Sequence, residues 1–124
     1  MARILVIDDS ETVYLTVRNA LMKDGHTVER LELLVRLPGL MRRDPPDLIL
    51  LDLNMPMLSG ASVGEFVRSY ETRPTRLIIY SSDTLEEMTR VQKRLGADAV
   101  LSKGVSPLNL RGVVNRVLAV PTAA

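Results

Sequence analysis

The sequence predicts an α/β fold in which a parallel sheet is covered by helices on both faces. Short apolar runs rich in β-branched residues alternate with longer stretches of helical period, and the chain has five of each. The apolar runs are nearly uninterrupted, which is typical of strands that are buried on both sides. The predicted strands span residues 3–8, 26–31, 47–52, 77–81 and 99–102.

The first two predicted helices differ in how clearly the sequence marks them. Ser10 can cap the first helix, which carries one apolar stripe and ends at Gly25. The stripe consists of Val13, Val17, Ala20 and Leu21. In the second helix, Pro38 and Gly39 interrupt the pattern over residues 31–43. We expect that helix to begin near Pro38, because proline is tolerated in a first turn.

Three further helices are predicted in the second half of the chain. The third runs from Ser59 or Gly60 to Tyr70, and the fifth covers residues 107–119. The fourth covers residues 84–95 and carries an apolar stripe that we expect to face the core. This stripe consists of Leu85, Met88, Val91 and Leu95.

The length and composition predict a single globular domain. A chain of 124 residues, 46% of them hydrophobic, can bury roughly two-thirds of the surface that it exposes when unfolded. We expect one domain over residues 1–120 and a short tail over residues 121–124. The longest aliphatic runs, residues 4–7 and 48–51, fall far short of the roughly 20 residues that span a bilayer, so no membrane segment is predicted.

Charge and residue usage exclude several classes of function. The chain has no Cys, which excludes thiolate catalysis and Cys-ligated metals and suits a reducing compartment, so we expect the cytoplasm. The net charge is only +1, the basic residues are scattered, and the aromatic residues are three Tyr and one Phe. Direct nucleic-acid binding is not expected, because it requires a basic surface or a set of aromatic stacking residues.

Polar residues that can take part in catalysis or metal binding follow four of the predicted strands. These residues are Asp8, Asp9, Asp52, Ser81 and Lys103. In an open α/β sheet the functional site lies beyond the carboxyl ends of the strands. We therefore expect three carboxylates, one hydroxyl and one ammonium group to meet at one edge of the sheet.

This set of residues suits the transfer of a phosphoryl group. Three neighbouring carboxylates repel one another unless a cation neutralises them, and Mg²⁺ prefers such oxygen ligands together with phosphate oxygens. Lys103 can place a positive charge at one phosphoryl oxygen, and the Ser81 hydroxyl can donate to another. Asp52 is then the candidate nucleophile that forms an acyl phosphate.

Four segments together resemble the receiver domain of two-component response regulators, and the resemblance covers essentially the whole chain. The segments are IDDS at residues 7–10, LLDLNMP at 50–56, YSS at 80–82 and SKG at 102–104. The resemblance implies a flavodoxin-like, doubly wound sheet of five parallel strands in the order 2-1-3-4-5, with five helices.

The resemblance also implies a role for each acidic residue. Asp52 is the phosphoacceptor by this likeness. Asp9 and Asp52 are carboxylate ligands of Mg²⁺, and the backbone carbonyl of Asn54 is a third ligand. Asp8 holds a water molecule bound to the metal. The family's phosphoryl donors are histidine kinases and phosphotransfer proteins, which we expect as partners, together with a downstream protein that the sequence does not identify.

Two residues depart from the family pattern. By the resemblance, Ser81 is the family's hydroxyl and Lys103 its phosphate-binding lysine. The family usually has a proline in a cis peptide after the lysine, whereas this chain has Gly104, so we expect a trans peptide and a looser loop. Val100 stands where the family has a mobile aromatic residue. Tyr80 cannot simply replace it, because adjacent strand residues point to opposite faces of a sheet.

Further positions bear on phosphoryl lifetime and on partners. In the family, the residues two beyond the phosphoacceptor and two beyond the hydroxyl tune the lifetime of the phosphoryl group, and here they are Asn54 and Asp83. An acid at Asp83 can orient an attacking water, so we expect a fairly short-lived phosphoryl group. Tyr14, Leu15 and Met22 are either scattered surface residues or a docking patch for the phosphoryl donor. In the family, the fourth helix, the fifth strand and the fifth helix form the output surface, through which a homodimer is conceivable. The lone His26 is expected to be at least partly exposed, without a catalytic role.

Other functions remain as alternatives to a phosphorylated receiver. Gly104 and Val100 motivate a receiver-like interaction module that binds its partner independently of phosphorylation. A phosphatase of the haloacid dehalogenase type needs a general acid two residues after the nucleophile, and Asn54 cannot serve as one. Flavin binding is not expected, since no glycine-rich phosphate loop follows the first strand. We therefore expect a phosphoacceptor domain that assists its own phosphorylation and dephosphorylation, not an enzyme.

Overall fold

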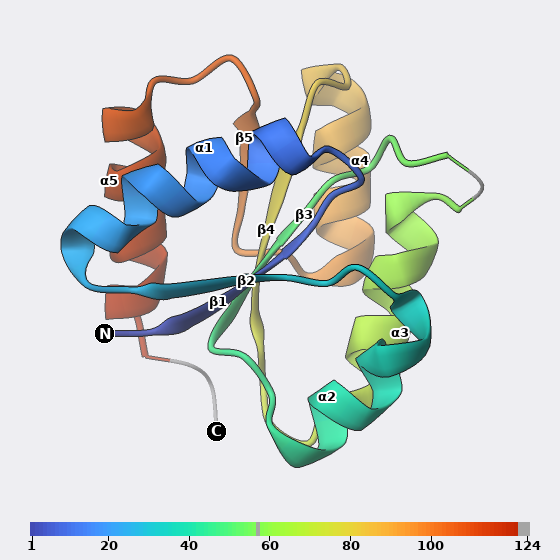
Figure 1. Cartoon of the computed structure of the whole chain (residues 1–124). Coiled ribbons are helices and arrows are strands. Elements are labelled where there is room, and N and C mark those ends of the chain that lie inside the picture. Colours follow the sequence, from blue (N-terminus) through green and yellow to red (C-terminus); the bar gives the residue numbers. More distant parts are fainter. Residues whose placement is uncertain (57, 122–124) are drawn as a thin grey trace.

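Five parallel strands form one sheet in the computed structural model, which describes residues 1–56 and 58–121. The strands are β1 (Arg3–Ile7), β2 (Thr27–Arg30), β3 (Leu48–Leu51), β4 (Arg76–Ser81) and β5 (Ala99–Ser102). Their order is β2-β1-β3-β4-β5, which confirms the doubly wound sheet that the sequence predicts (Figure 1). Each strand boundary lies within one residue of its predicted position.

Helices cover both faces of this sheet (Figure 1). They are α1 (Glu11–Leu21), α2 (Leu37–Arg43), α3 (Gly60–Tyr70), α4 (Leu85–Leu95) and α5 (Pro107–Ala119), with short 3₁₀ turns η1 (Met22–Asp24) and η2 (Leu34–Arg36). Helix α2 begins one residue before Pro38, close to its predicted start. The predicted tail lies outside the described residues except for Pro121.

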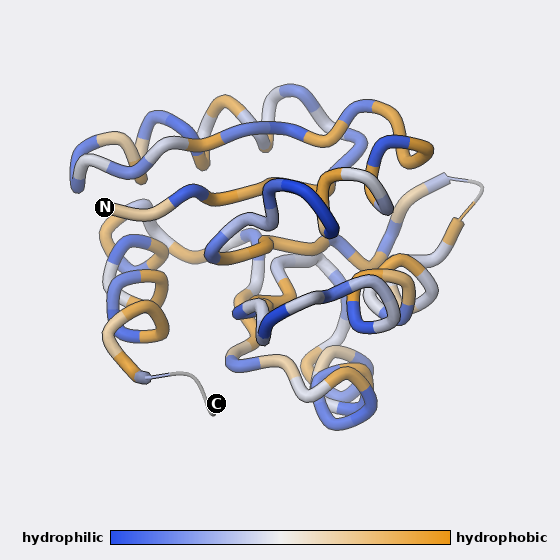
Figure 2. Tube along the Cα trace, turned by 90° about the horizontal axis from the view of Figure 1, so that it is seen from below, coloured by the Kyte–Doolittle hydropathy of each residue, from blue (hydrophilic) through white to orange (hydrophobic). Residues whose placement is uncertain are grey.

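The buried apolar residues form one cluster on each face of the sheet. Alternate residues of the strands point to opposite faces, so Ile4 and Leu50 pack with α1 and α5, whereas Leu5 and Ile49 pack with α2, α3 and α4. We call the first the α1–α5 cluster. Figure 2 shows hydrophobic residues following one another along the central strands, while hydrophobic and hydrophilic residues alternate along the helices.

Hydroxyl side chains fix where four of the helices begin. In each case the side-chain oxygen of the residue before the helix accepts a hydrogen bond from a backbone N–H of the first turn, a contact that contributes about 1 kcal/mol. The capping residues are Ser10 for α1, Ser59 for α3, Thr84 for α4 and Ser106 for α5. The caps determine where the loops end that carry the candidate site.

Two predicted side-chain positions are wrong. Leu85 is 67% exposed, because at the first position of α4 it lies where neighbouring elements no longer cover the apolar stripe, which begins at Met88. Tyr14 is not a freely exposed residue of α1: it is partly buried against the α1–α5 cluster, and its hydroxyl donates to the Val28 carbonyl at 3.2 Å. Leu15 remains exposed.

No helix in the described part of the chain has the length and apolar character needed to cross a membrane.

Candidate functional site

Three carboxylates meet at the carboxyl edge of the sheet. Asp8 and Asp9 follow β1, and Asp52 follows β3, its neighbour in the sheet. The Ile7–Leu51 pairing of these strands brings the residues after them side by side, and one oxygen of each carboxylate lies within 4.8 Å of the others. Asp8 and Asp52 are buried, whereas Asp9 is exposed. The convergence that the sequence predicts for these three acids is confirmed.

Lys103 lies between the two buried carboxylates. Its Nζ is 2.8 Å from Asp8 Oδ2 and 3.2 Å from Asp52 Oδ2. Burial alone would lower the pKa of Lys103, but hydrogen bonding and charge attraction from Asp8, and then from Asp52, outweigh it and raise the pKa above its usual value. One ammonium group among three carboxylates leaves a formal excess of two negative charges.

Short loops hold the two buried carboxylates in place. Asp8 Oδ1 accepts a hydrogen bond from the Ser10 N–H at 2.9 Å, and Asp52 Oδ1 accepts one from the Asn54 N–H at 3.2 Å. Asp8 Oδ2 is buried, and apart from its contact with the Lys103 ammonium it has no hydrogen-bond partner among the described residues. Buried carboxylate oxygens with spare capacity and an excess of negative charge fit a hard divalent cation such as Mg²⁺.

The predicted hydroxyl lies at the end of β4. Ser81 is fully buried, whereas Ser82 is exposed. Ser81 Oγ accepts a hydrogen bond from the Asp83 N–H at 3.3 Å, which leaves its own proton free to be donated. The Lys103 N–H donates to the Ser81 carbonyl at 3.0 Å, so backbone bonding continues from β4 into the loop that carries the lysine.

The loop after Lys103 has the trans peptide that the sequence predicts. The Gly104 N–H donates to Ser102 Oγ at 3.2 Å, and the Val105 N–H donates to the Ser102 carbonyl at 3.1 Å. These bonds close a tight turn, so the prediction of a looser loop is wrong. Val100 packs with the cluster of α2, α3 and α4, but Tyr80 is buried in the α1–α5 cluster. The two side chains therefore lie on opposite faces of the sheet. Burial raises the pKa of the Tyr80 hydroxyl.

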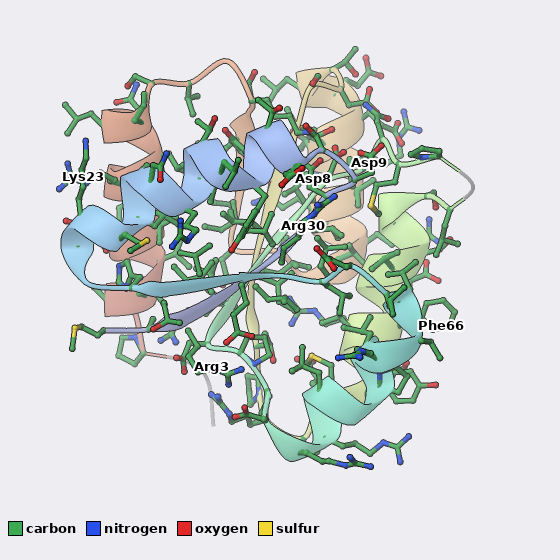
Figure 3. All side chains as sticks on the ribbon, in the orientation of Figure 1. Arg3, Asp8, Asp9, Lys23, Arg30 and Phe66 are labelled. Atoms are coloured by element: carbon green, nitrogen blue, oxygen red, sulfur yellow. The ribbon has the colours of Figure 1, made fainter. Side chains whose placement is uncertain are left out.

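Sequence reasoning missed two residues that support the site. The Arg30 guanidinium donates to the backbone carbonyls of Asp9, at 2.9 Å, and Asp8, at 3.3 Å (Figure 3). Gly60 packs so closely against the Asp52 carbonyl that a Cβ atom there would overlap it. An arginine at a strand end carries no distinctive signal, whereas a glycine directly after the capping Ser59 is a weak one.

His26 lies outside this site. It is half-buried, as predicted, and its Nδ1 accepts a hydrogen bond from the Ala2 N–H at 3.1 Å. Its Nε2 lies 2.8 Å from Asn115 Oδ1. These contacts join the start of the chain to α5, so the role of His26 is structural.

A doubly wound parallel sheet with three aspartates and a lysine at its carboxyl edge defines a flavodoxin-like α/β protein with an acidic site. The family model for the response regulator receiver domain matches residues 4–115. The chain therefore belongs to the response regulator receiver family, as the resemblance in its sequence implies.

Individual relatives agree with this assignment. Protein PilH of Pseudomonas aeruginosa is 35% identical over 120 residues, which cover 96% of this chain and 99% of that protein. A protein-glutamate methylesterase/protein-glutamine glutaminase of Methanospirillum hungatei is 36% identical over 91% of this chain, which spans only 34% of that relative.

Solved structures show the same fold. The chemotaxis protein CheY4 of Vibrio cholerae superposes with a TM-score of 0.81 and 28% identity, covering 94% of this chain and 98% of that one. The HemR receiver domain of Leptospira biflexa superposes with a TM-score of 0.85 over 100% of this chain and 99% of that one. Its 23% identity supports the fold alone.

Proposed function

We propose that this chain is a receiver that takes a phosphoryl group onto Asp52 from a phosphohistidine of a histidine kinase or a phosphotransfer protein. The observation that carries the proposal is the contact of one lysine with two buried aspartates beside a third aspartate. No other group of three metal-ligating side chains occurs among the described residues. The phosphorylated chain would then signal through altered binding to a downstream protein.

Mg²⁺ is the cofactor that we propose for this step. Asp9, Asp52 and the backbone carbonyl of Asn54 would hold the ion, and Asp8 would hold it through a water molecule. When bound, the ion neutralises the excess negative charge and draws electron density from the phosphoryl oxygens. Arg30 holds the Asp8 and Asp9 backbone in place from β2.

The transfer is an in-line displacement at phosphorus. A carboxylate oxygen of Asp52 forms the new P–O bond while the P–N bond to the donor imidazole breaks, and the electron pair of that bond stays on the imidazole nitrogen. Lys103 moves its hydrogen bonds from the carboxylates to a phosphoryl oxygen, and the Ser81 hydroxyl donates to another. These residues supply positioning and charge, which is most of what phosphoryl transfer requires.

Intact-mass spectrometry after incubation with acetyl phosphate and Mg²⁺ tests the proposal. We expect one phosphoryl adduct on the wild-type chain, and none on Asp52→Asn or in the presence of a chelator. An adduct that persists in Asp52→Asn would place the acceptor elsewhere. The proposed short lifetime of the adduct rests on Asp83, and unchanged dephosphorylation in Asp83→Ala would refute it.

A second candidate function is a receiver-like module that binds its partner without phosphorylation. Val100 and Gly104 favour it, because Tyr80 lies on the opposite face from Val100 and does not replace the missing aromatic residue. Partner binding that is identical for the wild-type chain and Asp52→Asn would support this alternative. In either case α4, β5 and α5 are the proposed output or homodimer surface.

A further inference from the structure

An apolar groove of about 140 Å³ lies between α3 and the segment formed by η2 and α2. We call it the α2–α3 groove. Leu34 and Pro38 line one side, and Phe66 and Tyr70 line the other. Phe66 projects from the outer side of α3 (Figure 3). Small-molecule sites usually have volumes of roughly 300–1,000 Å³, so this groove is too small for most of them. Its size suits one large side chain of a partner.

Exposed apolar side chains line the α2–α3 groove, at Leu34 and Phe66, or flank a lining residue in the chain, at Leu33 and Val35. Val35 is 83% exposed, Leu33 55% and Phe66 49%, and Leu34 is also exposed. Single exposed apolar residues are ordinary, but several next to one groove mark an interaction surface. These residues are not explained by packing within the chain.

The segment formed by η2 and α2, which lies along one side of the α2–α3 groove, carries three basic residues. Arg36, Arg42 and Arg43 are exposed, and none of them forms an ion pair within the part of the chain that the structure describes. The Arg42 guanidinium lies over the Tyr70 ring, 5.7 Å from its centre, at the groove wall. Three unpaired guanidinium groups favour a partner that carries carboxylates.

Two nearby acids do not cancel this charge. Asp44, which follows α2, is paired with Arg3, and Glu65 on α3 is paired with Arg94. Both carboxylates therefore already have a cation beside them. Glu32, just before η2, forms no ion pair among the described residues, so residues 32–43 keep an excess of two positive charges.

The α2–α3 groove is also continuous with the candidate site. A second cavity of about 330 Å³ reaches from Asp8 and Asp9 to Leu34 and Leu58, and the last two residues line the groove as well. Leu58 belongs to the loop that follows Asp52. A ligand in the groove would thus contact the loop that leads from the proposed phosphoacceptor.

We propose that the α2–α3 groove binds an amphipathic helix of a partner protein, with one apolar side chain in the groove and carboxylates facing Arg36, Arg42 and Arg43. A second copy of this chain is a poorer occupant, because a two-fold contact would place the arginines against their own equivalents. A membrane is poorer too, since the apolar side chains of Leu34, Phe66 and Tyr70 line a hollow. The proposal does not depend on phosphorylation.

Selection from a display library of helical peptides, randomised at their surface positions, tests the proposal on the unphosphorylated chain. We expect the selected peptides to pair apolar residues, spaced three or four apart, with Glu or Asp. Fluorescence anisotropy of the best peptide should show binding about tenfold weaker for Phe66→Ala and for Arg42→Glu, and weaker at high salt. Val120→Ala, which changes an exposed apolar residue just after α5, is the matched control and should bind normally.

Several outcomes would overturn the proposal. These are a selection that yields no binder or basic binders, binding that survives both Phe66→Ala and Arg42→Glu, and binding that Val120→Ala weakens equally. Sedimentation showing a dimer that Phe66→Ala dissociates would assign the groove to a second copy. Stronger binding to vesicles of anionic lipid than to the peptide would assign it to a membrane. Asp52→Asn should bind the peptide normally, which separates this test from that of the proposed function.

Discussion

The two edges of the sheet both carry acidic and basic residues, but they use them differently. At the amino edge, Asp47 Oδ2 accepts a hydrogen bond from the Arg3 N–H at 2.8 Å, and Asp98 Oδ2 accepts one from the Leu77 N–H at 2.9 Å. Each acid precedes one strand and caps the start of its neighbour. Figure 3 shows Arg3 well away from Asp8 and Asp9, towards the opposite edge of the sheet.

At the carboxyl edge two of the three carboxylates, Asp8 and Asp52, are buried but not fully bonded. Asp8 and Asp52 share Lys103, and the excess negative charge is not neutralised by other residues of the site. Satisfied charges at one edge stabilise the fold, whereas unsatisfied charges at the other leave binding capacity for a cation and a phosphoryl group. The comparison shows that structural and functional positions differ in whether the charged group is already paired and hydrogen-bonded within the fold. The presence of a charged residue alone does not distinguish them.

The largest expected effect comes from the amino edge. The Arg68 guanidinium donates to the carbonyls of Thr75, Leu95 and Gly96 and pairs with Glu71. Arg68→Ala would leave these carbonyls, two of them in partly buried hydrogen bonds, without a donor and lower the free energy of unfolding by about 3 kcal/mol. Urea denaturation measures the change. A loss below about 1 kcal/mol would contradict a structural role for this edge.

Gly60→Ala should destabilise the chain by about 2 kcal/mol, because the added methyl group displaces the backbone at Asp52. Gly112→Ala is the matched control, since Gly112 lies within α5 with no atom near its missing Cβ. That change should stabilise the chain by about 0.5–1 kcal/mol through helix propensity. Thermal unfolding compares the two, and equal effects would mean that Gly60 is not needed for close packing.

Arg30→Ala tests the support that β2 gives to the acidic site at the carboxyl edge. Loss of its hydrogen bonds to Asp8 and Asp9 should cost about 1 kcal/mol of stability and weaken Mg²⁺ binding severalfold. Arg30→Lys keeps the charge but cannot reproduce the two-pronged contact, so it should recover only part of the affinity. Full recovery with Lys would show that charge alone matters. Calorimetric titration with Mg²⁺ measures the affinity.

The smallest effect concerns pH and a surface pair. Hydrogen bonds from Arg111, then from Asn115, hold the pKa of Asp24 well below its usual value. As the pH falls, the Asp24 carboxyl is therefore protonated in the unfolded chain before it is protonated in the folded chain. The contribution of Asp24 to the free energy of unfolding is complete above about pH 4 and is lost as the pH falls further. Thermal unfolding between pH 6 and pH 2 should decline less steeply for Asp24→Asn than for the wild-type chain. Parallel curves would contradict this pairing.

Much of the fold follows from local patterns in the sequence. Strand positions, their parallel arrangement and the cap at Ser10 depend on apolar runs and on single residues, which a sequence displays directly. The exposure of Leu85 was predicted wrongly because periodicity identifies a helix face but not where its neighbours end. Tyr14 was misplaced for a related reason, since its partner Val28 is known only once β2 is placed beside α1.

The acidic site was predictable to a similar degree. Parallel strands end at a common edge, so Asp8, Asp52 and Lys103 had to meet there. The bonds from Arg30 depend on its pairing with Val6 across β1 and β2, a register that the sequence does not specify. Which carboxylate is buried and which is exposed depends on loop geometry, and that too required the structure.

The effect of Mg²⁺ on thermal unfolding tests most directly whether the carboxyl edge has unused binding capacity. We predict that Mg²⁺ raises the unfolding temperature of the wild-type chain, because a ligand that binds only the folded state stabilises it. Asp9→Asn should lose most of this rise, whereas Asp47→Asn, at the amino edge, should keep it despite a lower starting stability. Equal rises in all three chains, or no rise in the wild type, would contradict the account.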